Sequence, residues 1–223
     1  MKTILTFNCK NEHCLPPAFQ NDDVRFSDSF AEFFISHFTK PGDTVFDPFA
    51  GFGTTLFAAE KLGRRAVGVE LIQERAEYIK ERLYAQSAIH CGNALNLNEL
   101  ELPMIDFVLT SPPYMPKYGH SEYPLAGYKV TGQGYADYLK DLTRIFKQIC
   151  GFMANSAYAV IEASNLIIGG RFTPLAWDIA QSVGAVMPFK QELIIQWESD
   201  SLPAYGFGYD HSYALVFHKT ADK

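Results

Sequence analysis

The chain has 223 residues, of which 48% are hydrophobic and 14% aromatic, so it can bury a substantial core and is not typical of a disordered protein. Its formal net charge of −6 at pH 7 argues against a partner held by a broad basic surface, as in non-specific DNA binding. No stretch approaches the roughly 18 uncharged apolar residues that a membrane helix needs, and the first residues lack the apolar core of a signal peptide. We therefore expect a cytoplasmic protein that does not interact with a membrane.

The four cysteines are too few and too scattered for a disulfide framework, and we expect them to be reduced thiols. Cys9 and Cys14 flank His13 with a C-x4-C spacing. A zinc site would need better partners than these three residues, so we predict no metal.

Apolar periodicity predicts alternating helices and strands after an irregular leader at residues 1–23. The predicted helices are 26–38, 54–62, 72–84, 135–153 and 173–183. The predicted strands are 44–46, 65–69, 87–90, 105–109, 157–161, 192–197 and 212–218. The alternation indicates an α/β fold, with a doubly wound and mostly parallel seven-stranded sheet. The last two strands are joined by a connection too short for a helical crossover, so we expect the last strand to be antiparallel.

We interpret residues 1–223 as one domain, because no repeat, low-complexity tract or linker interrupts this pattern. Residues 115–134 are rich in Gly, Tyr, Pro and Lys and lack clear periodicity. We expect them to form a loop insertion on the substrate side of the domain.

The segment DPFAGFGTT at 47–55 places two glycines directly between a strand and a helix, where bare backbone can approach a ligand closely. It lacks the Gly-Lys-Ser/Thr of a P-loop and the third glycine of the dinucleotide fingerprint. The Asp47 carboxylate would repel a pyrophosphate but suits an ammonium group. Glu70 ends the next strand, where an acidic residue typically accepts hydrogen bonds from ribose hydroxyls. An adenosine ligand with a positively charged tail fits these features, and S-adenosylmethionine is such a ligand.

A second turn, Thr110-Ser111-Pro112-Pro113-Tyr114, follows the strand 105–109. The prolines fix their φ angles, so the Ser111 hydroxyl and the Pro112 carbonyl can act as acceptors held on a stiff frame. Tyr114 adds a flat face for stacking. Two acceptors and a stacking ring suit an aromatic ring that carries an NH2 group.

The chemistry of such an amine explains why it needs this turn. Its lone pair is delocalised into the ring, so the amine is a poor nucleophile. Acceptors for both hydrogens pull the nitrogen toward a tetrahedral geometry and direct the lone pair at the sulfonium methyl group, which transfers by in-line displacement. Ser111 is then a hydrogen-bond acceptor and not a covalent nucleophile, because the turn contains no histidine to activate it.

The segments DPFAGFGTT, VGVE and TSPPY together closely resemble the amino-group DNA methyltransferases, which form N4-methylcytosine or N6-methyladenine with S-adenosylmethionine. The resemblance extends over nearly the whole chain after Val24, and implies a Rossmann-like methyltransferase sheet and a restriction-modification setting. It implies that the cofactor-binding residues are Phe26, Ser27, Ser29, Asp47, Phe49, Gly51, Gly53, Thr54, Thr55, Glu70, Leu71, Asn93 and Ala94. It implies that the catalytic residues are Ser111, Pro112, Pro113 and Tyr114. Asn93 departs from the family pattern, which has Asp at the adenine contact.

Within this family Ser-Pro-Pro-Tyr is most associated with cytosine N4, so the resemblance favours cytosine N4 in DNA over adenine N6. The same motif order occurs in enzymes that methylate guanine amines in RNA, and RNA stays an alternative. Methylation of a protein glutamine amide is a further alternative, although its motif normally begins with Asn. A non-catalytic subunit that keeps the cofactor fold and binds nucleic acid is the alternative from another functional class.

Little of the chain is left over for reading a substrate. We expect the loop 115–134 to contact nucleic acid through Lys117, Tyr118, Tyr123 and Lys129, although tyrosines in such a loop can also pack on the edge of the sheet. The loop 199–210 contains glycines and aromatic residues. It either lines the opening of the same substrate site as the loop 115–134 or is a simple connection between two strands. Because the basic residues are few, we expect recognition with few phosphate contacts or with help from a partner.

Overall fold

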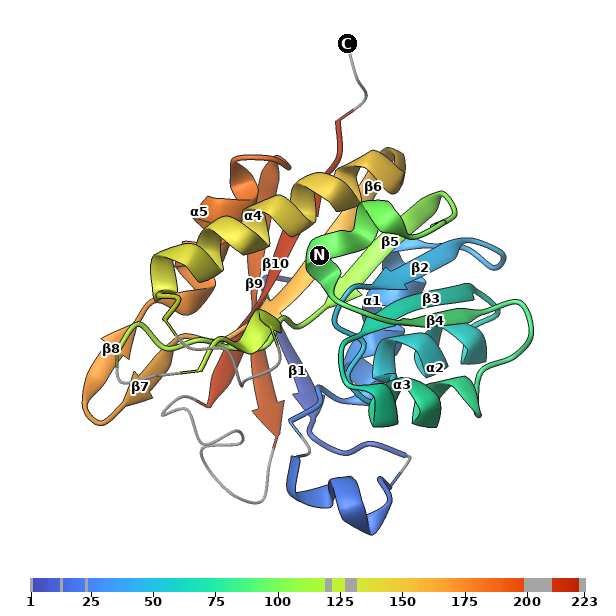
Figure 1. The fold of residues 1–223 in the computed structure, drawn as a ribbon, viewed down its shortest axis with the longest axis horizontal. Helices are drawn as coiled ribbons and strands as arrows, with labels where there is room; N and C mark the ends of the chain where they lie inside the picture. The colour runs from blue at the N-terminus through green and yellow to red at the C-terminus, as the bar shows by residue number, and fades with distance from the viewer. Residues whose placement is uncertain are drawn as a thin grey trace.

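The structure is a computed structural model that describes residues 2–12, 14–22, 24–118, 122–126, 132–198 and 210–220. An eight-stranded sheet runs through the centre of the molecule with helices on both faces (Figure 1). Its strand order is β1-β9-β10-β6-β5-β2-β3-β4. The pairings make every strand parallel to the others except β10, which is antiparallel to both of its neighbours.

Each predicted strand and helix is present, with bounds that differ from the predicted ones by up to about four residues. The strands are β1 Ile4–Asn8, β2 Thr44–Asp47, β3 Arg65–Glu70, β4 Ala88–Cys91, β5 Ile105–Thr110, β6 Met153–Ala163, β7 Leu166–Ile168, β8 Arg171–Thr173, β9 Phe189–Glu198 and β10 His211–His218. The α-helices are α1 Asp28–Phe38, α2 Thr54–Lys61, α3 Gln73–Lys80, α4 Tyr135–Phe152 and α5 Leu175–Gly184. The 3-10 helices within the described residues are η1 Pro17–Asp22, η2 Ala94–Glu99 and η3 Pro124–Ala126.

The main sheet has eight strands where the sequence predicts seven. The extra strand is β1, which pairs in parallel with β9 at the edge of the sheet. It lies in the leader that we expected to be irregular, because five residues at an edge give too short a periodic signal. The predicted antiparallel last strand is confirmed, and β10 lies inside the sheet between β9 and β6.

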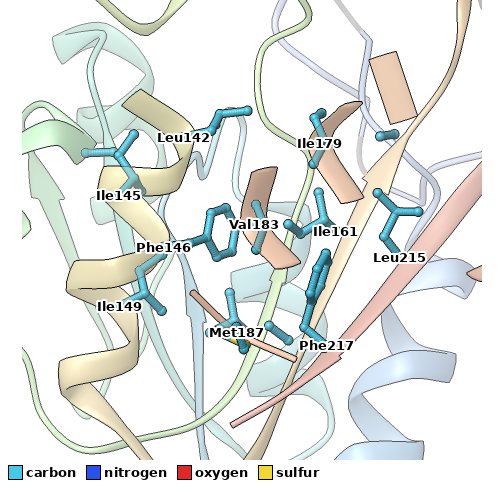
Figure 2. Close-up of a cluster of buried hydrophobic side chains, with 14 of the residues drawn as sticks. Leu142, Ile145, Phe146, Ile149, Ile161, Ile179, Val183, Met187, Leu215 and Phe217 are labelled. Atoms are coloured by element: carbon cyan, nitrogen blue, oxygen red, sulfur yellow. The ribbon is translucent and has the colours of Figure 1, made fainter. Parts of the chain in front are cut away.

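The two faces of the sheet carry separate hydrophobic cores. One core packs α1 and α2 against the sheet through side chains such as Phe30, Phe34 and Leu56. The other packs α4 and α5 against β6 and β10 and includes Phe146 and Phe217 (Figure 2). Because both faces are covered, the central strands are buried on both sides, which explains their continuous apolar runs.

A separate two-stranded hairpin, β7 and β8, follows β6 and projects from the body of the molecule (Figure 1). Gly169 and Gly170 form its turn with φ of 57° and 72°. Positive φ at both positions matches the tight turns that favour glycine in hairpins. The sequence prediction did not include this hairpin, since three-residue strands carry no usable periodicity.

None of the helices within the described residues is long and apolar enough to cross a membrane.

Candidate active site

A cavity of about 390 Å³ lies at the carboxyl ends of the central parallel strands and joins the two predicted turns. The volume is within the range of about 300–1,000 Å³ that is usual for small-molecule sites. The strand order reverses between β2 and β5, and ligands of doubly wound sheets bind at such a switch point. The predicted residues that line the cavity are Phe26, Asp47, Phe49, Gly51, Thr54, Thr55, Glu70, Leu71, Asn93, Ala94, Ser111, Pro112, Pro113 and Tyr114.

Asp47 ends β2 and is almost fully buried, with 3% of its surface exposed. Its Oδ1 accepts hydrogen bonds from the Phe49 amide at 3.0 Å and from the Thr110 hydroxyl at 2.6 Å. Burial raises the pKa of Asp47 from 3.8 to about 6, although these hydrogen bonds act in the opposite direction. A cationic ligand beside Asp47 would favour the ionised carboxylate and lower its pKa again. This property agrees with a ligand that has a positively charged tail.

The glycines of the turn have different physical roles. Both need positive φ, 57° at Gly51 and 87° at Gly53. Gly51 lines the cavity, whereas Gly53 is absent from its lining and faces the helix behind the turn. A Cβ at Gly53 would meet Phe57 Cε2 at 2.9 Å and Ile79 Cγ1 at 3.0 Å. Gly53 therefore allows α2 to pack close to the turn.

Glu70 braces the same turn from the neighbouring strand. Its Oε2 accepts from the Gly51 amide at 2.8 Å, and its Oε1 accepts from the Ile72 amide at 2.8 Å. Burial raises the pKa of Glu70, and the two amides oppose that rise. Each carboxylate oxygen can accept a second hydrogen bond, so the carboxylate keeps acceptor capacity toward the cavity.

Two other predicted groups cap helices. Asn93 Oδ1 accepts from the Leu95 amide at 2.9 Å and caps η2, while Asn93 and Ala94 both line the cavity. Ser27 caps α1, accepting from the Phe30 amide at 3.4 Å and bonding to the Ser29 hydroxyl at 3.0 Å. Ser27 and Ser29 do not line the cavity, whereas the adjacent Phe26 does.

The turn after β5 is tied to an acidic residue on the next strand. Ser111 Oγ donates to Glu162 Oε2 at 2.8 Å, and Tyr114 Oη donates to the same oxygen at 2.9 Å. Because Ser111 directs its proton to Glu162, the lone pairs of its oxygen stay available as acceptors. The bond from Tyr114 fixes the orientation of its ring beside the cavity.

Sequence reasoning missed Glu162, which lies within the buried strand β6 and also lines the cavity. Only 6% of its surface is exposed, and this burial raises the pKa of Glu162. Hydrogen bonds from Ser212, Ser111 and Tyr114 lower the pKa but do not cancel the rise. The acidic residue within the apolar run 157–163 of this strand was the available signal, because buried carboxylates require partners. The parallel pairing of β5 with β6 aligns Thr110 with Ile161, which brings Glu162 next to Ser111.

The predicted substrate residues divide into three groups. Lys117 and Tyr118 are exposed beside the β7–β8 hairpin, and the Lys117 amide donates to Thr173 Oγ1 at 3.0 Å. Tyr123 is buried in the core and donates to Asp141, whereas the sequence predicts that it contacts a base. Lys129 lies outside the described residues, as do His13 and most of the loop 199–210.

The residues around the cavity fit an adenosine-type cofactor with a positive charge. Asp47 and Glu70 supply acidic groups, and the buried Thr54 Oγ1 has no hydrogen-bond partner within the described part of the chain. A buried hydroxyl of this kind is typical of a site that a ligand completes. Among the described residues, no cluster of three His, Cys, Asp or Glu side chains could hold a metal ion.

The strand order of the main sheet, with its antiparallel β10, gives an α/β fold that is similar to solved Rossmann-like methyltransferases. TrmN from Thermus thermophilus superposes with a TM-score of 0.59 at 15% identity, over 86% of this chain and 48% of that chain. A TehB-like methyltransferase from Corynebacterium glutamicum has a TM-score of 0.57 at 14% identity, over 91% of this chain and 93% of that chain.

Residues 11–81 match the DNA methylase family model for N6 and N4 enzymes, which confirms the predicted resemblance over the cofactor turn and Glu70. The putative methylase YubD of Escherichia coli is 44% identical over 61 residues, 27% of each chain. The type II methyltransferase M.BamHI of Bacillus amyloliquefaciens is 51% identical over 49 residues, 22% of this chain and 11% of that protein. The matches therefore span about a quarter or less of these relatives. These partial matches and the likeness in fold agree with the predicted S-adenosylmethionine cofactor.

Proposed function

We propose that the protein is an S-adenosylmethionine-dependent methyltransferase that acts on the exocyclic amine of a nucleobase, most consistently cytosine N4 in DNA. The observation that carries this proposal is the pair of hydrogen bonds from Ser111 and Tyr114 to the buried Glu162, beside the same cavity as Asp47 and Glu70. The match of residues 11–81 to the N6 and N4 DNA methylases supports the same reaction class.

Asp47, Glu70 and the Gly51 turn hold the cofactor at one end of the cavity in this proposal. S-adenosylmethionine, when bound, supplies an electrophilic methyl group on a sulfonium. Asp47 faces the positively charged part of the ligand, and Glu70 uses its remaining acceptor capacity for the ribose hydroxyls.

At the other end, Ser111 and the Pro112 carbonyl accept the two N–H groups of the target amine, and Tyr114 stacks on its ring. The amine nitrogen gains the methyl group and loses one hydrogen as a proton. That proton passes to the Ser111 oxygen while Ser111 releases its own proton to Glu162. A buried carboxylate with a raised pKa is suited to receive it.

The test compares Ser111→Ala and Tyr114→Ala with the wild-type protein, using labelled cofactor and separate samples of DNA, RNA and protein. We expect label in the N4-methylcytosine of DNA, a loss of at least about 100-fold in each variant, and unchanged cofactor affinity by calorimetry. Nucleoside mass spectrometry distinguishes N4-methylcytosine from N6-methyladenine and from methylated RNA bases. Label found only in protein, or full activity in both variants, would refute the proposal.

A further inference from the structure

The β7–β8 hairpin carries a surface of exposed apolar side chains at the edge of the cavity. Ile167, Ile168 and Phe172 are 42%, 45% and 43% exposed, and Trp177 at the start of α5 is 56% exposed. The rings of Phe172 and Trp177 are in edge contact with centroids 6.2 Å apart. Contiguous exposed apolar patches on soluble proteins mark interaction sites more often than scattered single residues do.

The hairpin is firmly attached at its base. Thr173 accepts from the Lys117 amide, which joins β8 to the segment directly after the catalytic turn. Asn165 Oδ1 accepts from the Ala176 amide at 3.1 Å, which joins the start of the hairpin to α5. The surface is therefore presented in a fixed position relative to Ser111 and Tyr114.

One face of the hairpin is continuous with the candidate active site. Cross-strand pairing places Ile168 and Arg171 on this face and Ile167 and Phe172 on the opposite face. Leu166 and Ile168 of β7 line the cavity itself, together with Pro116. On the adjacent strand, the Arg171 guanidinium lies over the Tyr118 ring, 5.5 Å from its centroid. Tyr118 is itself 47% exposed. Ile168, Arg171 and the Tyr118 ring thus lie together on the cavity side of the hairpin.

We propose that this hairpin surface, defined by Ile167, Ile168, Arg171, Phe172 and Trp177, binds the nucleotides that flank the target base. This inference rests on the proposed function and assigns its substrate contact. Aromatic side chains stack on bases of any sequence, and apolar side chains inserted between base steps hold a duplex open. Arg171 supplies a phosphate contact or stacks on a base.

A nucleic-acid strand is the occupant that satisfies both features of this surface. Ile168 lines the cavity, whereas Phe172 and Trp177 contact each other on the other face of the hairpin. An occupant that covers both faces therefore passes around the hairpin and continues into the cavity. A strand with one base turned into the cavity does so, since its neighbouring bases become unstacked at the mouth. Stacking also resolves the conflict with the net charge of −6, because it needs few phosphate contacts.

The experiment measures binding of a fluorescein-labelled, mixed-sequence single-stranded DNA by anisotropy in the presence of S-adenosylhomocysteine. We expect Phe172→Ala and Trp177→Ala each to weaken binding by about 5- to 150-fold, the range for one stacking side chain. Their affinity for S-adenosylhomocysteine should stay within about twofold of wild type, since neither side chain lines the cavity. Met104→Ala is the matched control, because Met104 is 68% exposed but precedes the opposite end of β5.

Intrinsic fluorescence gives an independent measurement without substitution at the surface. The chain has two tryptophans, and Trp197 is only 3% exposed, so acrylamide quenching reports mainly on Trp177. We expect the DNA to protect Trp177 from acrylamide. DNA affinity equal to wild type in both variants, or quenching unchanged by DNA, would overturn the inference.

The outcomes separate this inference from the proposed function. If the wild-type protein methylates DNA and both hairpin variants bind DNA as tightly as it does, only the hairpin contact is refuted. A wild-type protein that binds the cofactor but neither binds nor methylates nucleic acid would refute both. Wild-type dimers that Trp177→Ala dissociates, with unchanged DNA affinity, would assign the surface to self-association and overturn the inference.

Discussion

Glu162 links the two hydroxyls of the catalytic turn to a buried negative charge. Glu162→Gln keeps the size and one acceptor oxygen of this side chain but removes its charge and its capacity to receive a proton. We expect kcat to fall by about 100-fold or more, because general-base contributions are typically 100- to 10,000-fold. Burial of the ionised Glu162 carboxylate, which raises its pKa, costs free energy of folding, and a neutral glutamine does not have this cost. We therefore expect the stability not to fall and the cofactor affinity not to change.

The measurement is single-turnover methylation with denaturation curves of both proteins. Glu192→Gln is the control, because Glu192 lies on the exposed part of β9. A Glu162→Gln protein with wild-type kcat would show that Glu162 only positions the turn.

Asp47 makes the stability and the cofactor affinity depend on pH. Its pKa is higher in the folded protein, about 6, than the ordinary 3.8, so the folded state holds more protons between these values. Stability of the ligand-free protein therefore falls as pH rises from about 4 to 6, and the full cost above pH 6 is about 3 kcal/mol. A positively charged ligand needs the ionised carboxylate, so we expect its affinity to rise about tenfold between pH 5 and 7.

Calorimetry with S-adenosylmethionine across this pH window checks the prediction. Asp47→Asn should bind more weakly at pH 7 and lose most of the pH dependence. Asp106→Asn is the control, since Asp106 accepts from the Thr44 amide at the opposite ends of β2 and β5. An Asp47→Asn protein with the wild-type pH profile would remove Asp47 from the cation contact.

At the scale of elements, the turn between β2 and α2 depends on the absence of a side chain at Gly53. Gly53→Ala adds a strained positive φ and a Cβ 2.9 Å from Phe57. Gly42→Ala adds only the strain, because its φ is 89° and nothing lies within 4 Å of the new Cβ. We expect Gly42→Ala to cost about 1–2 kcal/mol of unfolding free energy and Gly53→Ala about 1–3 kcal/mol more.

Urea denaturation of the two variants beside wild type measures this difference. Because Gly53 does not line the cavity, any loss of cofactor affinity in Gly53→Ala should follow from movement of the turn. Equal destabilisation by the two substitutions would show that Phe57 and Ile79 move aside at no cost.

At the scale of the whole molecule, the net charge of −6 limits how strongly phosphates contribute to binding. Among the described cations, Arg25 and Arg75 line the cavity, and Lys117 and Arg171 lie at the hairpin beside it. With about two or three phosphates neutralised, the slope of log K against log salt should be about −2 to −3 for duplex DNA. Anisotropy titrations across a series of salt concentrations measure it, and a slope steeper than about −6 would require a basic surface that these residues do not supply.

The sequence alone determined the alternating elements, the turn at Asp47 and the turn at Ser111, because these signals are local: glycines and prolines in short segments and apolar runs in buried strands. Tertiary structure decided which side chains meet. Parallel pairing of β5 and β6 brings Glu162 to Ser111 although they are 51 positions apart. Tertiary packing buries Tyr123 in the core, and pairing with β9 makes a strand of residues 4–8 in the leader. These outcomes depend on contacts between distant segments, which no local pattern encodes.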